Sequence, residues 1–97
     1  MNYEDLFIEF MEMDDIVYEN DYMKVVKIIK EIPTGSSKYV KRVQLVKWKN
    51  KKTDVPDLDI RTFSLKDNKY KKGITLNRIE AKALHQALND FYAKRDL

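Results

Sequence analysis

The chain has 97 residues, of which 43% are hydrophobic and 36% charged, and a formal net charge of +3; this size and composition predict one small globular domain. It contains no cysteine and one histidine, His85, which excludes disulfides, a cysteine nucleophile and metal sites built on thiolates or paired histidines. No apolar run is long enough to span a membrane, and the acidic N-terminus is unlike a secretory signal. We therefore expect an intracellular protein with no membrane segment, metal or other cofactor.

The small net charge is the sum of two opposite segments. Residues 1–23 contain eight acids and no Lys or Arg, whereas residues 24–97 contain nineteen Lys or Arg and eight acids. The first segment therefore carries −8 and the second +11. We interpret residues 1–23 as an acidic N-terminal helical extension and residues 24–97 as the main, basic domain.

The first predicted element is a short helix over residues 3–13. Its apolar residues fall on one side of a helical wheel and its acids on the other. Asn2 is a candidate N-cap, with Asp5 in the first turn. A helix of this length needs a surface on which to pack. The apolar side consists of Tyr3, Leu6, Phe7, Phe10 and Met13.

Four strands follow. Residues 24–32 are rich in β-branched residues, although their apolar positions do not keep one parity. Residues 38–49 alternate between a face that starts at Tyr39 and a face that starts at Val40. The two remaining strands are predicted at 58–64 and 69–76, with a tight turn between them. The short connections favour antiparallel pairing.

The last element is an amphipathic helix over residues 78–93. Asn77 and Glu80 have the spacing of a capping box. The expected fold is therefore α+β, a four-stranded antiparallel curved sheet followed by a C-terminal helix, with the extra N-terminal helix. The apolar stripe of the C-terminal helix, which predicts core or dimer interface, is Ala81, Leu84, Ala87, Leu88 and Phe91.

The residues between 38 and 72 combine many cations with aromatic side chains. Cations neutralise phosphates, and exposed aromatics stack on unpaired bases, so the combination favours single-stranded nucleic acid over duplex. The alternative is that the aromatics fill the core and the lysines only solvate the outer face. The aromatic residues of this stretch are Tyr39, Trp48, Phe63 and Tyr70.

Two short motifs carry a family resemblance. The segments Asp59-Ile60-Arg61-Thr62-Phe63-Ser64 and Lys72-Gly73-Ile74-Thr75-Leu76, followed by the amphipathic helix, resemble the transcriptional coactivator family of positive cofactor four. The match covers residues 24–93 and is closest to small bacterial members of that family. Ser64 departs from the pattern, because a tryptophan is common at this position in the eukaryotic branch.

The resemblance implies a homodimer whose curved sheets bind single-stranded DNA with little sequence specificity. It further implies a bacterial-type cytoplasmic protein in transcription regulation, with the transcription machinery as a partner, or in DNA replication or repair. Arg61 and Lys72 look like backbone contacts and Trp48 like a base-stacking aromatic, while Phe63 would stack or support the sheet. The predicted nucleic-acid-binding residues are Arg42, Lys47, Trp48, Lys49, Arg61, Phe63, Lys71 and Lys72.

Other functions have weaker support. A protein-interaction module whose basic sheet binds an acidic partner stays open, as does binding of single-stranded RNA. We expect no enzyme, because Asp57 and Asp59 are not joined by a second acidic cluster and His85 is expected at the surface. A further hypothesis is that the acidic extension, including Glu9 and Glu12, covers the basic face and competes with nucleic acid.

Overall fold

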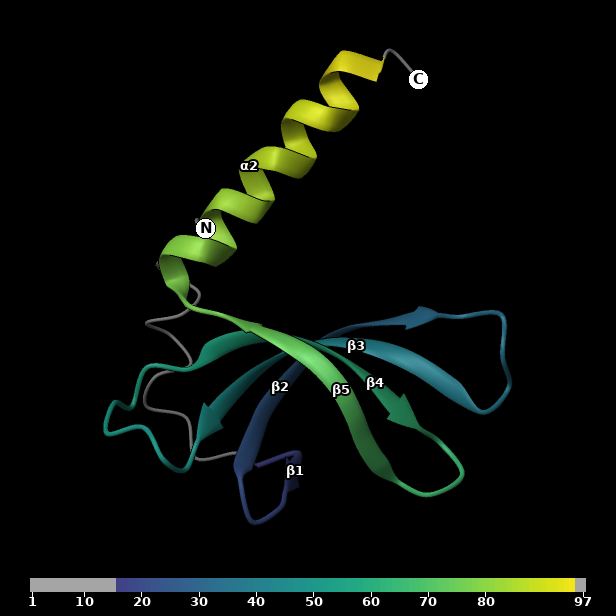
Figure 1. Cartoon of the computed structure of the whole chain (residues 1–97), viewed down its shortest axis with the longest axis vertical. Coiled ribbons are helices and arrows are strands. Elements are labelled where there is room, and N and C mark those ends of the chain that lie inside the picture. The colour runs from purple at the N-terminus through teal and green to yellow at the C-terminus, as the bar shows by residue number, and fades with distance from the viewer. Residues whose placement is uncertain (1–15, 96–97) are drawn as a thin grey trace.

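The computed structural model describes residues 16–95. Five strands form one antiparallel sheet in chain order, and one helix follows them (Figure 1). The α+β class and the antiparallel sheet are confirmed, and the helix predicted at 3–13 lies outside the described residues. The elements are β1 (Tyr18–Glu19), β2 (Met23–Pro33), β3 (Tyr39–Trp48), β4 (Asp57–Ser64), β5 (Lys69–Leu76) and α2 (Arg78–Arg95).

The prediction of four strands is wrong by one, because β1 precedes them. Tyr18 of β1 pairs with Val25 of β2, and the amide of Val17 donates to the Val25 carbonyl at 2.7 Å. A two-residue strand has no periodicity that a sequence pattern can reveal. It forms here because a tight turn folds it back onto β2, so part of the segment assigned to the acidic extension belongs to the sheet.

The mixed parity of β2 has a structural cause. The pairing register between β2 and β3 shifts once between Val25 and Lys27 and again between Ile28 and Lys30. Each β-bulge inserts an extra residue and moves the following side chains to the other face. Val25 and Ile28 therefore pack in the same apolar cluster, although a separation of three residues would place them on opposite faces of a regular strand.

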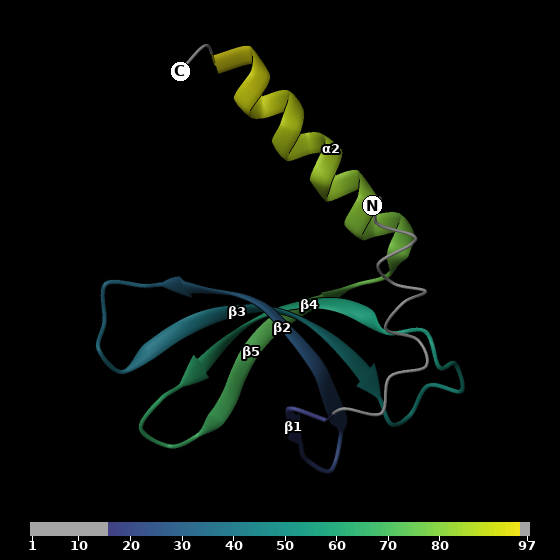
Figure 2. The ribbon, with the colours of Figure 1, turned by 180° about the vertical axis from the view of Figure 1, so that it is seen from behind.

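The sheet curls away from α2, so the face opposite α2 is concave (Figures 1 and 2). The helix face, as we call the other side, has an apolar cluster of Val26, Leu45, Leu58 and Ala81. The concave face has a second cluster of Met23, Val25 and Val46, against which Tyr18, Ile28, Trp48 and Tyr70 pack. Both faces of a small sheet are thus partly covered.

The helix α2 is fixed to the sheet only at its start. The Asn77 amide donates to the Glu80 carboxylate and the Glu80 amide donates to the Asn77 side-chain oxygen, both at 2.9 Å, which confirms the capping box. Ala81 is buried against the helix face, whereas Leu88 and Phe91 are about half exposed. The rest of α2 therefore projects from the sheet (Figure 1). No helix in the described range is long and apolar enough to cross a membrane.

Gly73 allows two strands to come unusually close. It pairs with Arg61, and a Cβ built at Gly73 would lie 2.4 Å from the Ile60 carbonyl oxygen. Because real Cβ atoms do not approach a backbone oxygen so closely, only glycine fits this position without a backbone shift. The close approach aligns Arg61 with β5 and fixes the centre of the candidate site.

Candidate nucleic-acid interface

The structure divides the eight predicted binding residues between different surfaces. Direct pairing of Arg42 with Arg61, and of Val40 with Phe63, places these side chains on the concave face together with Trp48. Lys47 lies two residues after the buried Leu45 in β3, so its side chain is on the same side of the sheet, the helix face. Three exposed lysines lie at the ends or edge of the sheet, namely Lys49, Lys71 and Lys72.

Arg61 is held by a carboxylate of its own strand. Its Nε and Nη2 atoms donate to the two oxygens of Asp59 at 3.1 and 3.0 Å, and its Nη1 atom donates to the Lys71 carbonyl oxygen at 3.1 Å. The Asp59 side chain is fully buried, whereas that of Arg61 is 16% exposed. This fork-shaped pair fixes the guanidinium. Arg61 therefore positions β4 against β5 and leaves little of its own charge unopposed.

Arg42 is held in a comparable way by side chains from two other strands. Its Nε donates to Glu31 at 2.8 Å and its Nη1 to the Tyr70 hydroxyl at 3.0 Å. Its guanidinium also lies 3.7 Å from the centre of the Phe63 ring, a cation–π contact. Burial lowers the pKa of Arg42, but its hydrogen bonds to Tyr70 and Glu31 outweigh this effect and leave the pKa raised, so the group stays charged.

A buried polar network joins the two arginines. The Tyr70 hydroxyl donates to Gln44 Oε1 at 2.7 Å, and Gln44 Nε2 donates to Asp59 at 3.0 Å. Asp59 also accepts from the Thr75 hydroxyl at 2.8 Å. Burial raises the pKa of Tyr70, an effect that Arg42 partly offsets, so the phenol is neutral near pH 7 and can serve as this donor. Among the described residues, no buried side-chain polar atom lacks a partner.

Phe63 supports the sheet and does not face solvent. It is 3% exposed, and its ring lies 4.7 Å from Tyr70 and 6.3 Å from Tyr18, centre to centre. Tyr18 of β1 also contacts Tyr70 edge-on at 4.8 Å. These rings fill the concave face between Arg42 and β1. Of the two roles that the sequence left open for Phe63, this packing favours the supporting one.

Trp48 is the accessible aromatic of the predicted set. It ends β3, pairs with Met23 and is partly exposed. The Arg61 guanidinium lies 5.4 Å from the centre of its ring, so Arg61 also braces this side chain. Trp48 lines two surface hollows, and a base that reaches either one meets an aromatic wall.

The predicted lysines differ in how much of their charge is neutralised. Lys49 pairs with Glu19 at 2.7 Å, and this exposed pair lowers the pKa of the Glu19 carboxyl. Lys71 and Lys72 lie on β5 opposite a shift in its register with β4, and within the described residues neither has an acidic partner. The unopposed positive charge of the predicted set is therefore concentrated on the edge strand.

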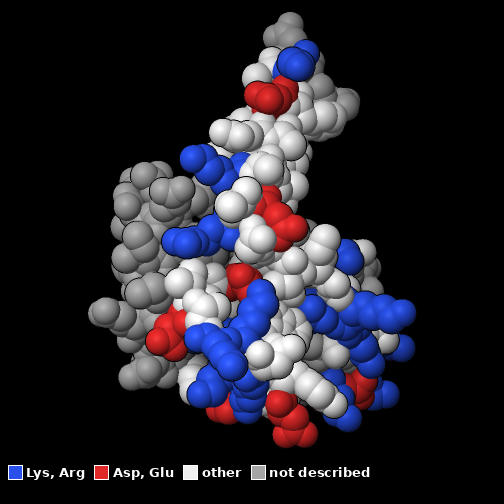
Figure 3. Space-filling view, turned by 60° about the vertical axis from the view of Figure 1, so that its left-hand side comes forward, with Lys and Arg blue, Asp and Glu red and all other residues white. Residues whose placement is uncertain are grey.

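The charge distribution agrees with this division. Residues 16–76 contain fifteen Lys or Arg and seven Asp or Glu, whereas α2 contains four Lys or Arg and two Asp or Glu. Four of the seven acids are in ion pairs with Lys49, Lys51, Arg42 and Arg61. Figure 3 shows Lys and Arg side chains gathered over the sheet, below α2. The charge excess thus belongs to the sheet.

The competition hypothesis for the acidic extension can be followed only in part. Glu9 and Glu12 lie outside the described residues. Glu19, which belongs to the same acidic segment, does contact a predicted binding residue through its ion pair with Lys49. The hypothesis stays a prediction.

Sequence reasoning missed several residues that shape this surface. Glu31 accepts from Arg42, and Gln44 donates to the Asp59 carboxylate that holds Arg61. Tyr18 and Tyr22 come from the segment that the sequence predicts to be helical. Gln44 lies two residues after Arg42 in an alternating strand, so the sequence already indicated that the two side chains share a face. Tyr18 had no such signal, because β1 is too short. His85 is exposed, as predicted, and Asn89 lies 3.1 Å from its Nε2 atom.

The comparisons with known proteins give no relative. The sequence matches no family model and no curated protein. The resemblance to positive cofactor four therefore depends on the motifs around Arg61 and Gly73, and its implications are proposals. In the range 16–95 no three His, Cys, Asp or Glu side chains are grouped so that they could hold a metal ion.

Proposed function

We propose that this protein binds single-stranded DNA with little sequence specificity through the basic and aromatic side chains of its sheet. The observation that carries the proposal is the surplus of exposed lysines on the sheet, of which Lys71 and Lys72 have no acidic partner among the described residues. Such lysines bind phosphates independently of sequence. Trp48 supplies the stacking surface that a protein partner would not need.

The proposal includes a biological context. The resemblance to positive cofactor four supports a role in transcription regulation, or in DNA replication or repair, within a bacterial-type cytoplasm. Contacts with the transcription machinery would then use surfaces that the nucleic acid leaves exposed. Catalysis is not part of the proposal, because the arginines and acids of the concave face are engaged with one another.

A competition experiment tests the binding mode. Labelled oligo-dT bound to the full chain is challenged with unlabelled oligo-dT, duplex DNA and single-stranded RNA at two salt concentrations. We expect oligo-dT to compete better than duplex, since a duplex hides its base faces, and all affinities to fall with salt. Equal competition by duplex would contradict the proposal, and stronger competition by RNA would reassign its ligand.

The single tryptophan distinguishes a nucleic acid from an acidic protein partner. If Trp48 stacks on bases, oligo-dT quenches its fluorescence, whereas heparin, a polyanion without bases, quenches it far less. Equal quenching by both would favour the alternative, a module that binds an acidic partner through charge alone.

We also propose that the protein is a homodimer that pairs through α2. This helix is 18 residues long, about 27 Å at 1.5 Å per residue, and Ala81 is the one buried side chain among those described in it. A projecting helix is marginal in water unless its apolar side is covered. In a homodimer, the same apolar side of α2 in the second copy can cover it. The large apolar side chains that α2 leaves exposed along this side are Leu88, Phe91 and Tyr92.

Light scattering coupled to size exclusion tests the dimer. The full chain is expected at twice the monomer mass of 11.6 kDa, and a Leu88→Glu, Phe91→Glu variant at the monomer mass, because buried charge opposes helix pairing. Lys82→Glu on the same helix is the control. A monomeric wild-type protein would contradict this part of the proposal and leave DNA binding untouched.

A further inference from the structure

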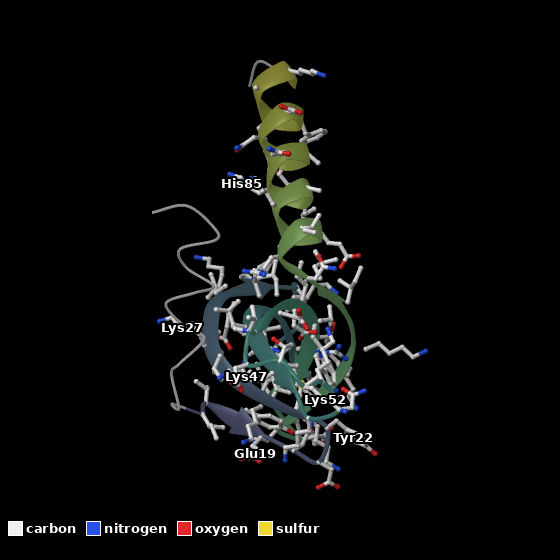
Figure 4. All side chains as sticks on the ribbon, turned by 90° about the vertical axis from the view of Figure 1, so that its left-hand side faces the viewer. Glu19, Tyr22, Lys27, Lys47, Lys52 and His85 are labelled. Atoms are coloured by element: carbon white, nitrogen blue, oxygen red, sulfur yellow. The ribbon has the colours of Figure 1, made fainter. Side chains whose placement is uncertain are left out.

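A hollow at the end of β3 combines two aromatic side chains, Tyr22 and Trp48, that come from distant parts of the chain. It has a volume of about 420 Å³ and is lined by Asp21, Tyr22, Trp48, Lys49 and Asn50. This volume is within the range of sites that hold small ligands. Tyr22 is 72% exposed, and Figure 4 shows it projecting outward at the end of the molecule opposite α2.

The turn that carries Tyr22 is held in place by hydrogen bonds. The side-chain oxygen of Asn20 accepts from the amides of Tyr22 and Met23 at 2.8 and 2.9 Å. The Asn20 amide donates to the Met23 carbonyl at 3.0 Å, and the Lys49 amide donates to the Tyr22 carbonyl at 2.9 Å. The backbone of Tyr22 is thereby fixed beside the end of β3. Only the ring is left to respond to a ligand, which lowers the ordering cost of binding.

Trp48 is the second aromatic residue of the lining, and its side chain is well supported. It packs against the buried cluster of Met23, Val25 and Val46. It also lines a second hollow of about 290 Å³, which shares Asn50 with the first. The two hollows therefore adjoin at Trp48, and a chain of nucleotides can pass from one to the other across this ring.

The lining favours a base over a phosphate. The ring faces of Tyr22 and Trp48 suit a planar π system, and stacking of this kind is tolerant of base identity. The Asp21 carboxylate repels phosphate but accepts a hydrogen bond from a base N–H group. Lys49 lies at the rim, and its exposed ion pair with Glu19 is of the kind that contributes little to stability. A phosphate can therefore compete with Glu19 for Lys49.

We infer that Tyr22 and Trp48 form a subsite that holds one unpaired base of a bound single strand, with the adjoining phosphate at Lys49. This inference rests on the proposed function and adds to it a contact from the β1–β2 turn. Tyr22 belongs to the segment that was expected to be only an acidic helical extension. The segment thus contributes to binding at this position.

The test compares a variant that lacks the Tyr22 ring with the wild type, on oligonucleotides with and without bases. The full-length protein and its Tyr22→Ala variant are titrated into end-labelled oligo-dT and into an end-labelled abasic oligonucleotide of equal length, and the fluorescence anisotropy of the label is followed. For oligo-dT we expect Tyr22→Ala to weaken binding about fivefold to 150-fold, the range of a single stacking contact. For the abasic strand we expect a change below about twofold, because phosphate contacts remain.

Matched variants separate the ring from other effects. Tyr22→Phe keeps the ring and should retain wild-type binding. Leu65→Ala removes an exposed apolar side chain without a ring, in the β4–β5 turn, and should leave both affinities unchanged. Since the Tyr22 ring is mostly exposed, its removal should not affect folding, which circular dichroism verifies.

The possible outcomes test the Tyr22–Trp48 subsite separately from the proposed binding of single-stranded DNA. Equal weakening of both oligonucleotides by Tyr22→Ala, or no change with oligo-dT, would overturn the subsite while the wild-type protein still binds single strands. A wild-type protein that does not prefer oligo-dT over duplex would overturn the proposed function and the subsite together.

Discussion

The arginines at the centre of the sheet and the lysines at its edge belong to one basic pattern in the sequence, yet they have different environments. Arg61 and Arg42 donate to Asp59 and Glu31 and are mostly buried. Lys71 and Lys72 on β5 are exposed and have no acidic partner in the part of the chain that the structure describes. A cation that is engaged by the protein's own carboxylate contributes to the fold first, and a cation without one is available to phosphate.

The largest effect on stability is expected from breaking the ion pair between Asp59 and Arg61. Asp59→Asn leaves the Arg61 guanidinium without its carboxylate, and loss of one partner of a buried pair typically costs about 3 kcal/mol or more. We expect the free energy of unfolding, measured with urea, to fall by about that amount. Asp54→Asn, in an exposed loop, is the control and should change it by less than about 0.5 kcal/mol. If both variants unfold alike, this ion pair is not structural.

A smaller loss is expected from Tyr70→Phe. The variant leaves the buried Oε1 of Gln44 without a donor and removes an acceptor from Arg42, which should lower the free energy of unfolding by about 2 kcal/mol. Its size should depend on pH. Because the folded-state pKa of Tyr70 is raised, its stabilising contribution is complete below the unfolded value of 10.0 and declines as the pH rises through it.

The measurement is the difference in unfolding free energy between the wild type and Tyr70→Phe from pH 8 to pH 11. This difference should shrink toward the alkaline end. Tyr22→Phe, at an exposed position, controls for the loss of a hydroxyl. A constant difference across this pH range would show that the Tyr70 hydroxyl is not held as the structure has it.

The smallest effect on stability is expected at the edge. Lys71→Ala and Lys72→Ala should each change the free energy of unfolding by less than about 0.5 kcal/mol. Each should nevertheless weaken oligo-dT binding and reduce the slope of log affinity against log salt by about 0.7, the value for one phosphate contact on a single strand. Lys82→Ala on α2 is the matched control. Unchanged slopes would place the phosphate contacts elsewhere on the sheet.

Much of the fold was predictable because patterns among residues close in sequence indicate its strands and its helix. The strands predicted at 38–49, 58–64 and 69–76 agree with β3, β4 and β5 to within one residue at each end, and the capping box placed the start of α2 at Arg78. Alternation within β3 also divided its side chains correctly between the two clusters. These features depend on residues close in sequence, which act without the rest of the molecule.

The candidate site was less predictable for a physical reason. The motif around Arg61 marked the correct region, but whether its guanidinium meets a phosphate or Asp59 depends on rotamers and pairing that composition does not specify. The two bulges in β2 and the two-residue strand β1 likewise depend on contacts with neighbours. Tyr22 entered the site only because the β1–β2 turn lies beside the end of β3.

The sequence alone determined the order of the main strands and the last helix, the separation of acidic and basic segments, and the presence of cations and aromatics in the sheet. Tertiary structure decided which of these side chains remain accessible. It buried Phe63 beneath Arg42, joined Arg61 to Asp59 and left Trp48 and Tyr22 at a surface hollow. The reason is that periodicity specifies the face on which a side chain lies, whereas burial and charge pairing depend on which strands and turns are brought against that face.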